Sequence, residues 1–249
     1  DASPDNTGDV VAAFADPRIL YLVLEQHRGA GHARDTATKA ARGELIAFLD
    51  QDDLYHPEKL AQHVAHFAAD QNLGASYSGR FDLIPSDTSI RDIWVLPNPV
   101  TLADLVLGFP IAPSDLVLRR EWALRPDLEA VHTLFHGGEI IRYGRLYLDG
   151  CTFAPVPRAL SYHRYHAGRV VRNLEQNCAS YRYAQSVILD DPRCPPDVQA
   201  LRTKAFTGSY LVWAWYAFAQ HETDLGQQLV RQAVALTPQL TDAPDCELT

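Results

Sequence analysis

The acidic end of one short apolar run constrains the fold of this chain more than any other feature. Residues 45–49 are apolar, include Ile and Phe, and follow Gly43, a pattern that is typical of a buried strand. Three carboxylates, Asp50, Asp52 and Asp53, come directly after the run. Such crowding is unfavourable unless a cation is present, and Mg²⁺ or Mn²⁺ with oxygen ligands relieves the repulsion. Because open α/β sheets bind ligands beyond the carboxyl ends of their strands, the run predicts a metal or phosphate site.

Helix capping is the alternative explanation of the same acids. Asp accepts hydrogen bonds from the free N–H groups of a first helical turn, and Pro57 suits such a turn. One carboxylate is enough for a cap, whereas this turn carries three. The sequence therefore favours a metal or phosphate site and leaves capping open for one of the acids.

Helix and strand patterns alternate through the first 170 residues. Strands are predicted over residues 19–24, 45–49, 74–84, 111–119, 151–155 and 158–166. Helices are predicted over residues 10–15, 32–41, 57–70, 101–106 and 139–148. Residues 85–99 are predicted to form a polar loop, and residues 125–138 fit a substrate loop and a surface connection equally well. The alternation indicates an α/β fold with a mostly parallel sheet flanked by helices.

The character of the chain changes after residue 172. Three further helices are predicted over residues 174–189, 197–220 and 225–236. Their many aromatic residues are interpreted as packing rather than as a binding site. The chain is therefore expected to divide into residues 1–170 and a C-terminal α-helical appendage, residues 171–249, whose last dozen residues are frayed.

The composition excludes several classes of protein. A net charge of -9 argues against a broad nucleic-acid surface. The sequence shows no signal peptide and no apolar run of membrane-spanning length. Its four cysteines lack the paired spacing of metal sites, which favours free thiols in a reducing compartment. These features predict a cytoplasmic protein without a transmembrane segment.

Several motifs resemble the family 2 glycosyltransferases, which are nucleotide-sugar-dependent enzymes with the GT-A fold. The most specific is GELIAFLDQDD at residues 43–53, followed by PEKL at residues 57–60. DASPDNT at residues 1–7 stands in place of the family's Asp-Asp-Gly-Ser-x-Asp turn, and GHARD at residues 31–35 in place of its Gly-x-x-Ala-Arg-Asn. Further similar stretches are residues 114–120, 137–146 and 163–166, so the resemblance covers about residues 1 to 170.

The chain also departs from the family pattern. Asp35 replaces the usual Asn, and Gly138 and Glu139 stand where Glu and Asp are usual. The family's first strand and the helix after it would precede Asp1, so the resemblance implies a chain that is incomplete at its N-terminus. The same departures keep open a non-catalytic module that binds a nucleotide sugar or docks on a partner.

The resemblance implies a divalent ion, Mn²⁺ or Mg²⁺, held by the Asp-x-Asp pattern of Asp50 and Asp52. His166 is implied as a further metal ligand, although a hydrogen-bonded surface histidine is an equal alternative. Glu139 is implied as the general base that takes the acceptor proton, which permits a single displacement with inversion. A carboxylate in a first helical turn is also favoured by the helix dipole alone, so that alternative stays open.

Four more residues are implied to bind the nucleotide sugar. Arg34 and Arg164 are candidates for the diphosphate, with a surface salt bridge as the alternative for each. Asp1 and Asp5 are implied to contact the base or ribose, although Asp5 could also cap a helix.

The sequence and the resemblance together predict metal-dependent, inverting transfer of a sugar from a nucleotide diphosphate sugar, with a UDP-sugar favoured, to an acceptor hydroxyl. The acceptor would be a glycan, a lipid-linked molecule or a protein, in glycan or surface polysaccharide assembly at the inner face of the membrane. Besides the binding module, another phosphate enzyme remains as an alternative. A nucleotidyltransferase would need a Gly-rich basic loop, and an aspartyl-phosphate phosphatase a later Ser or Thr and Lys; neither pattern stands out.

Overall fold

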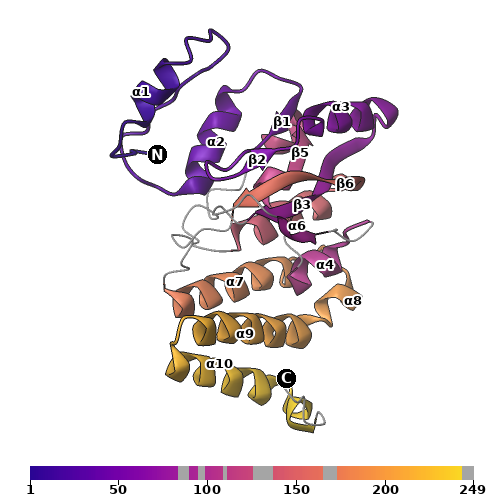
Figure 1. Cartoon of the computed structure of the whole chain (residues 1–249). Coiled ribbons are helices and arrows are strands. Elements are labelled where there is room, and N and C mark those ends of the chain that lie inside the picture. The colour runs from indigo at the N-terminus through magenta and orange to yellow at the C-terminus, as the bar shows by residue number, and fades with distance from the viewer. Residues whose placement is uncertain (84–89, 95–98, 109–110, 126–136, 165–172, 243–249) are drawn as a thin grey trace.

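One mixed sheet forms the centre of the molecule, and helices cover it (Figure 1). The computed structural model describes residues 1–83, 90–94, 99–108, 111–125, 137–164 and 173–242. Its strands are β1 (Leu45–Ala47), β2 (Leu54–Tyr55), β3 (Leu73–Leu83), β4 (Ile90–Trp94), β5 (Leu116–Arg119) and β6 (Thr152–Arg164). They lie in the order β1-β5-β3-β6-β2, and β4 pairs with the later part of β3.

The mixed sheet was expected, but the expected excess of parallel pairs is wrong. Among the described strands, only the β3–β6 pair is parallel. The reason is that β5 lies between β1 and β3 and runs antiparallel to both. Consequently β1, β3 and β6 still point the same way, and their carboxyl ends meet at one edge of the sheet, where a ligand of an α/β fold binds.

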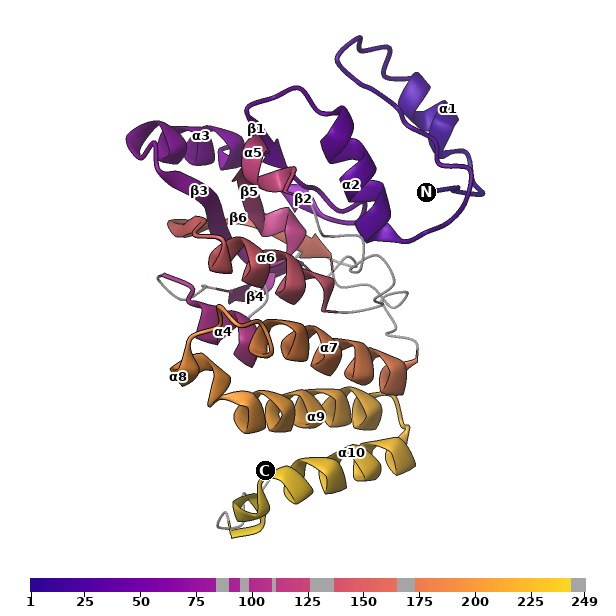
Figure 2. The ribbon, with the colours of Figure 1, turned by 180° about the vertical axis from the view of Figure 1, so that it is seen from behind.

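The helices form layers on the sheet and a stack beyond it. They are α1 (Thr7–Ala12), α2 (Ala30–Ala40), α3 (Lys59–Ala69), α4 (Leu102–Leu107), α5 (Arg120–Ala123), α6 (Gly138–Leu148), α7 (Leu174–Leu189), α8 (Pro196–Gln199), α9 (Arg202–Ala219) and α10 (Thr223–Leu236), with short 3₁₀ turns η1 (Pro113–Asp115) and η3 (Pro238–Asp242). Helices α7, α9 and α10 stack one below another, and α6 and α4 lie between this stack and the sheet (Figure 2). The two termini lie at opposite ends of the molecule.

Local sequence signals explain several of these boundaries. Thr101 caps α4 as predicted: its hydroxyl accepts a hydrogen bond from the Asp104 N–H (3.2 Å), and the Asp104 carboxylate accepts one from the Thr101 N–H (2.8 Å). This reciprocal pair is a capping box. Gly108 ends the helix in the left-handed conformation, which favours glycine.

Several predicted elements differ in the structure. Residues 19–24 form no strand among the described elements; most of their side chains are exposed, and apolar alternation cannot make a strand without a neighbour to pair with. The predicted loop over 85–99 contains β4 where it is described, because that segment folds back on β3. The two strands predicted over 151–166 are one strand, β6, through residue 164. The helix predicted over 197–220 is interrupted between α8 and α9.

Helix α6 is packed on both sides. Its Tyr143 and Leu146 join Ile46, Tyr77 and other side chains in the core against the sheet. Its Ile140 joins a second cluster on the far side, which also contains side chains of α7, among them Ala184 and Ile188. A fully buried Leu or Ile contributes about 1.5–3 kcal/mol. The appendage therefore shares its core with α6.

A glycine allows this close contact. A Cβ atom at Gly144 of α6 would lie 2.7 Å from two carbon atoms of Ile188 on α7. That distance is far inside van der Waals contact, so a side chain at residue 144 would require Ile188 to shift or α6 and α7 to separate.

Two further expectations concern cysteines and membrane spans. Cys151, Cys178 and Cys194 are buried free thiols, as predicted, and Cys246 lies outside the described residues. In the part of the chain that the structure describes, no helix has the length and apolar character needed to cross a bilayer.

A line of polar groups is buried between α3 and β3. The Lys59 ammonium donates a hydrogen bond to the Ser78 hydroxyl (3.2 Å) and lies 3.3 Å from His63 Nε2, and the other ring nitrogen of His63 lies 2.7 Å from the Ser76 hydroxyl. Burial lowers the pKa of Lys59 to about 8. Burial, and then the neighbouring Lys59 charge, lower the pKa of His63 to about 3.

The Lys59 shift predicts a specific pH dependence of stability. Its pKa is about 8 in the folded protein and 10.5 without the fold, so between these values the unfolded chain binds more protons and stability rises with pH. From about pH 7.5 to about pH 9.5, the wild-type free energy of unfolding should gain about 2 kcal/mol relative to that of Lys59→Met. Urea unfolding at both pH values measures this, with Lys39→Met, at an exposed lysine, as the control. A constant difference between wild type and Lys59→Met would contradict it.

Candidate functional site

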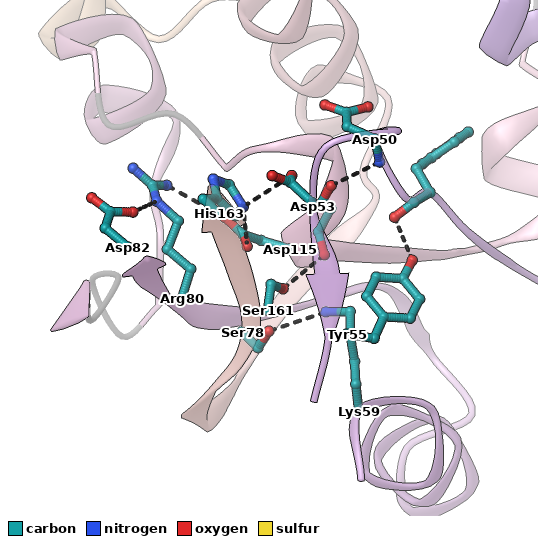
Figure 3. Close-up of polar contacts among 12 residues, drawn as sticks. Asp50, Asp53, Tyr55, Lys59, Ser78, Arg80, Asp82, Asp115, Ser161 and His163 are labelled. Atoms are coloured by element: carbon teal, nitrogen blue, oxygen red, sulfur yellow. Dashed lines mark hydrogen bonds and ion pairs between the residues drawn. The ribbon is translucent and has the colours of Figure 1, made fainter. Parts of the chain in front are cut away.

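The acidic turn, residues 50–53, joins β1 to β2 at the carboxyl end of β1. The Asp53 N–H donates to the Asp50 carbonyl (3.0 Å), which closes the turn. Its carboxylates do not share one environment: Asp53 is buried, whereas Asp50 and Asp52 are partly exposed. Figure 3 shows the Asp53 carboxylate turned toward His163 and the Asp50 carboxylate pointing away from it. The acids therefore divide into an inward and an outward set.

Three predicted site residues meet beside the turn. Arg34, in α2, donates a hydrogen bond to Asp50 (2.6 Å), and its second terminal nitrogen lies 3.7 Å from the Glu139 carboxylate at the start of α6. Burial disfavours the charge of Arg34, but Asp50 and Glu139 outweigh it and keep the pKa of the guanidinium above its ordinary value. A partly buried cation thus lies between the proposed metal ligand and the proposed base.

A second ion pair ties the same two helices together. Arg142 of α6 is buried and pairs with Asp35 of α2. Tyr143, the next residue, is also buried, and burial and then Glu139 raise the pKa of its hydroxyl. Helix α6 begins after Gly137, which is in the left-handed conformation. These contacts fix the direction in which the first turn of α6 presents Glu139.

The other predicted residues lie around this centre or outside the described chain. The Asp1 carboxylate accepts hydrogen bonds from the N–H groups of Arg28 (2.9 Å) and Gly29 (2.8 Å), directly before α2. Asp5 is exposed and accepts the N–H of Thr7 (3.1 Å), but Asn6 is at the N-cap position of α1 and no side chain caps this helix, so the capping alternative for Asp5 is wrong. Arg164 is exposed at the end of β6, and His166 lies outside the described residues.

The outward carboxylates suit a divalent ion that is shared with a substrate. Within the described ranges, no group of three or more Asp, Glu, His or Cys side chains is placed to hold a metal. Mg²⁺ in nucleotide enzymes is held by one or two carboxylates together with substrate phosphates, so a three-residue cage is not required. Asp50 and Asp52 supply hard oxygen ligands at a ligand-binding edge of the sheet, which fits such an ion.

No role was predicted from the sequence for the residues that surround Asp53, the inward acid. Ser114 and Asp115 in η1 and His163 in β6 all lie against Asp53 or the turn, and all are buried. One sequence signal was available: Ser114 and Asp115 come directly before an apolar run, whereas the acids of the turn come directly after one. These segments are far from the turn in the sequence, so local sequence patterns could not predict that they contact it.

The N-terminal part of this chain is similar to a known protein family. Residues 1–112 match the family model described as glycosyl transferase family 2. This part of the chain is similar to glycosyl transferase family 2. The family segment contains α2, the acidic turn and β3, and it ends just before η1. It therefore includes Arg34, Asp50 and Asp52, but not Glu139.

Curated relatives of the family 2 segment have names from polysaccharide synthesis. The Escherichia coli protein WfgD, named UDP-Glc:alpha-D-GlcNAc-diphosphoundecaprenol beta-1,3-glucosyltransferase, is 37% identical over 120 residues, which is 48% of this chain and 46% of the relative. The succinoglycan biosynthesis protein ExoO of Rhizobium meliloti is 34% identical over 114 residues, 43% of this chain and 33% of the relative. The chain thus spans less than half the length of these relatives.

Solved structures of low sequence identity share the fold over nearly the whole chain. S. aureus TarS in complex with UDP-GlcNAc has a TM-score of 0.62 at 16% identity, covering 98% of this chain and 72% of that one. The mannosyltransferase PcManGT from Pyrobaculum calidifontis, in complex with GDP-Man and Mn²⁺, has a TM-score of 0.57 at 18% identity, covering 98% and 76%. The family 2 segment and the residues after it form a GT-A fold with a mixed sheet flanked by helices, as predicted.

Proposed function

We propose that this protein transfers a sugar from a nucleotide diphosphate sugar to an acceptor hydroxyl, with a divalent ion and with inversion at the anomeric carbon. The observation that most supports this proposal is that Arg34 contacts both Asp50, at 2.6 Å, and Glu139, at 3.7 Å. A carboxylate metal ligand, a diphosphate-binding cation and a base are the groups that this reaction requires. The family match supplies the reaction class.

The donor side is formed by α2 and the acidic turn. Arg34 can exchange its bond with Asp50 for a charge-assisted bond to the diphosphate. Asp50 and Asp52 would hold Mn²⁺ or Mg²⁺, with His166 as a further ligand; when bound, the ion supplies positive charge that stabilises the leaving diphosphate. Arg164 is proposed as a second contact to the diphosphate.

The nucleoside is proposed to bind next to the start of α2. Asp1 is held there by two backbone N–H groups, and with Asp5 it would contact the base or ribose. A uridine diphosphate sugar is favoured, since WfgD is named for UDP-Glc and TarS was solved with UDP-GlcNAc.

Glu139 is the proposed general base. Its carboxylate takes the proton from the acceptor hydroxyl while the hydroxyl oxygen forms a bond to the anomeric carbon. The bond from that carbon to the diphosphate oxygen breaks on the opposite side, and the diphosphate leaves with the electron pair. Arg34 beside Glu139 favours the ionised carboxylate that can accept this proton.

The acceptor is proposed to be the growing glycan of a surface polysaccharide on a lipid carrier. The name of WfgD specifies a diphosphoundecaprenol-linked acceptor, and ExoO is named for succinoglycan biosynthesis. With an acceptor of this class, the proposed site of the reaction is the cytoplasmic face of a membrane.

A panel of nucleotide sugars tests this function. Purified protein is incubated with each donor and Mn²⁺, Mg²⁺ or EDTA, and release of the nucleoside diphosphate is measured. We expect metal-dependent release from at least one uridine diphosphate sugar. If calorimetry shows metal-dependent UDP binding but no donor is turned over with any acceptor fraction, the chain is a binding module instead.

Removing the Arg34 charge should weaken donor binding. Charge-assisted hydrogen bonds contribute about 1.5–3 kcal/mol, so Arg34→Met should raise the dissociation constant of UDP with Mn²⁺ by about 10- to 100-fold. Calorimetry measures the constant, and Lys39→Met, which changes an exposed charge on the same helix, is the control. Equal affinity of wild type and Arg34→Met would remove Arg34 from the diphosphate site.

A further inference from the structure

A buried ionic network lies directly beneath the acidic turn. His163 Nε2 is 3.2 Å from the Asp115 carboxylate and 3.6 Å from that of Asp53 (Figure 3). Asp115 has no exposed surface, and His163 and Asp53 are 3% and 7% exposed. On the other side of Asp115, Arg80 lies at 3.4 Å and also pairs with Asp82 at 3.6 Å. The network joins β3, η1 and β6 to the turn.

One buried hydroxyl closes the turn from below. The Asp50 N–H donates a hydrogen bond to the Ser114 hydroxyl (3.0 Å), and the Ser114 side chain in turn hydrogen-bonds the Asp53 carboxylate. The Ser114 carbonyl accepts a hydrogen bond from Ser161 (2.8 Å), which fixes η1 on β6. Ser114 therefore touches both ends of the turn, and its own position is set by the sheet.

A buried ionic network contributes little net free energy to the stability of a fold. Burying charges costs free energy that a well-packed apolar cluster of similar volume would not require, so buried ion pairs are poor evidence of a purely stabilising role. Groups retained at such a cost, at the edge where the turn presents Asp50 and Asp52, point to a requirement for a defined geometry.

We propose that Ser114, Asp115 and His163 are positioning residues that hold the inward Asp53 and thereby fix the turn in the shape that presents Asp50 and Asp52 to a divalent ion. The effect on ion binding rests on the proposed function. The effect on the shape of the turn belongs to the protein alone and needs no ligand. Asp53 is on this basis an anchor of the turn and not a metal ligand. Asp50 and Asp52 are then the two carboxylates of the turn that bind the ion.

The positional effect can be measured without any ligand. Hydrogen–deuterium exchange is followed by mass spectrometry on peptides covering residues 48–56 in wild type, Ser114→Ala and Asp115→Asn. Both changes keep the volume nearly constant, and both should speed exchange of these amides by about tenfold or more. The matched control is Ser209→Ala in α9, which removes a buried hydroxyl that bonds Gln185 (2.9 Å) and should leave peptides 48–56 unchanged. Exchange within about twofold of wild type in both variants would overturn the proposal.

The consequence for the ion is measured with Mn²⁺ and UDP as probes. Residues that orient metal ligands typically change metal affinity by about 10- to 100-fold when replaced, so Ser114→Ala and Asp115→Asn should weaken Mn²⁺ binding by this factor, and Ser209→Ala should not. Variants with faster exchange but wild-type Mn²⁺ affinity would overturn the role toward the ion. If wild type binds neither Mn²⁺ nor UDP, the proposed function fails, while the exchange experiment still decides whether the network fixes the turn.

Discussion

Replacing Glu139 by Gln is expected to lower kcat for sugar transfer by about 10²- to 10⁴-fold, the contribution typical of a positioned general base. The amide keeps the size of the side chain but cannot take the acceptor proton. The donor KM should stay within a few-fold, because Asp50 and the rest of the donor side remain in place and Glu139 is 3.7 Å from Arg34 rather than directly bonded to it. Loss of kcat with unchanged donor binding is the signature of an interaction made in the transition state.

Steady-state kinetics with a donor found in the nucleotide-sugar panel measures the effect. Glu175→Gln is the matched control, because Glu175 is also an acid in the first turn of a helix, α7, but is exposed. This control separates the helix dipole from the chemistry: if the two variants lose the same small factor, Glu139 is only a favourable first-turn acid. Turnover of Glu139→Gln within a few-fold of wild type would remove it from the mechanism.

Gly137→Ala is expected to cause a large loss of stability. Gly137 has a φ of +87°, and a Cβ atom there would lie 2.9 Å from the Ala184 Cβ and 3.1 Å from the Tyr181 Cα, both on α7. The left-handed conformation costs about 1–2 kcal/mol, and overpacking against backbone adds about 1–3 kcal/mol. Because Glu139 is two residues further on, kcat should fall as well.

The chain provides a close control for this substitution. Gly150 has nearly the same φ, +89°, but nothing lies within 4 Å of its would-be Cβ. Gly150→Ala should therefore show the conformational cost of about 1–2 kcal/mol alone and lower Tm by about 2–8 °C, whereas Gly137→Ala adds the overpacking cost and should lower Tm by about 4–20 °C, and by more than Gly150→Ala. Differential scanning calorimetry measures both. An equal decrease in Tm for the two variants would mean that α7 moves aside at little cost in free energy and does not position the start of α6.

Features encoded within a few neighbouring residues were predicted well. The apolar run before the acidic turn, the cap at Thr101 and the amphipathic helix that carries Glu139 are all set by local patterns of apolar, capping and helix-forming residues. The GT-A fold followed from the resemblance of such patterns. The division of the chain near residue 170 stays a proposal, since the family match ends at residue 112.

Features that depend on distant partners were not predicted. The insertion of β5 between β1 and β3 pairs residues at least 39 positions apart, and no local pattern distinguishes it from a parallel neighbour. The same applies to the network: Asp50 and Ser114 are 64 positions apart, and Asp115 and His163 are 48 apart. The predicted strand over residues 19–24 failed for the opposite reason, because its propensity was favourable and a pairing partner was not found among the described strands.

The contact of Gly144 with Ile188 has an evolutionary consequence. A mutation that enlarges residue 144 requires the side chain at 188 to shift or shrink, so these two positions should vary together among related sequences. Recombination that exchanges the C-terminal helices between relatives would separate such matched pairs. The C-terminal helices should therefore be inherited together with the helix that carries Glu139, as one unit of descent.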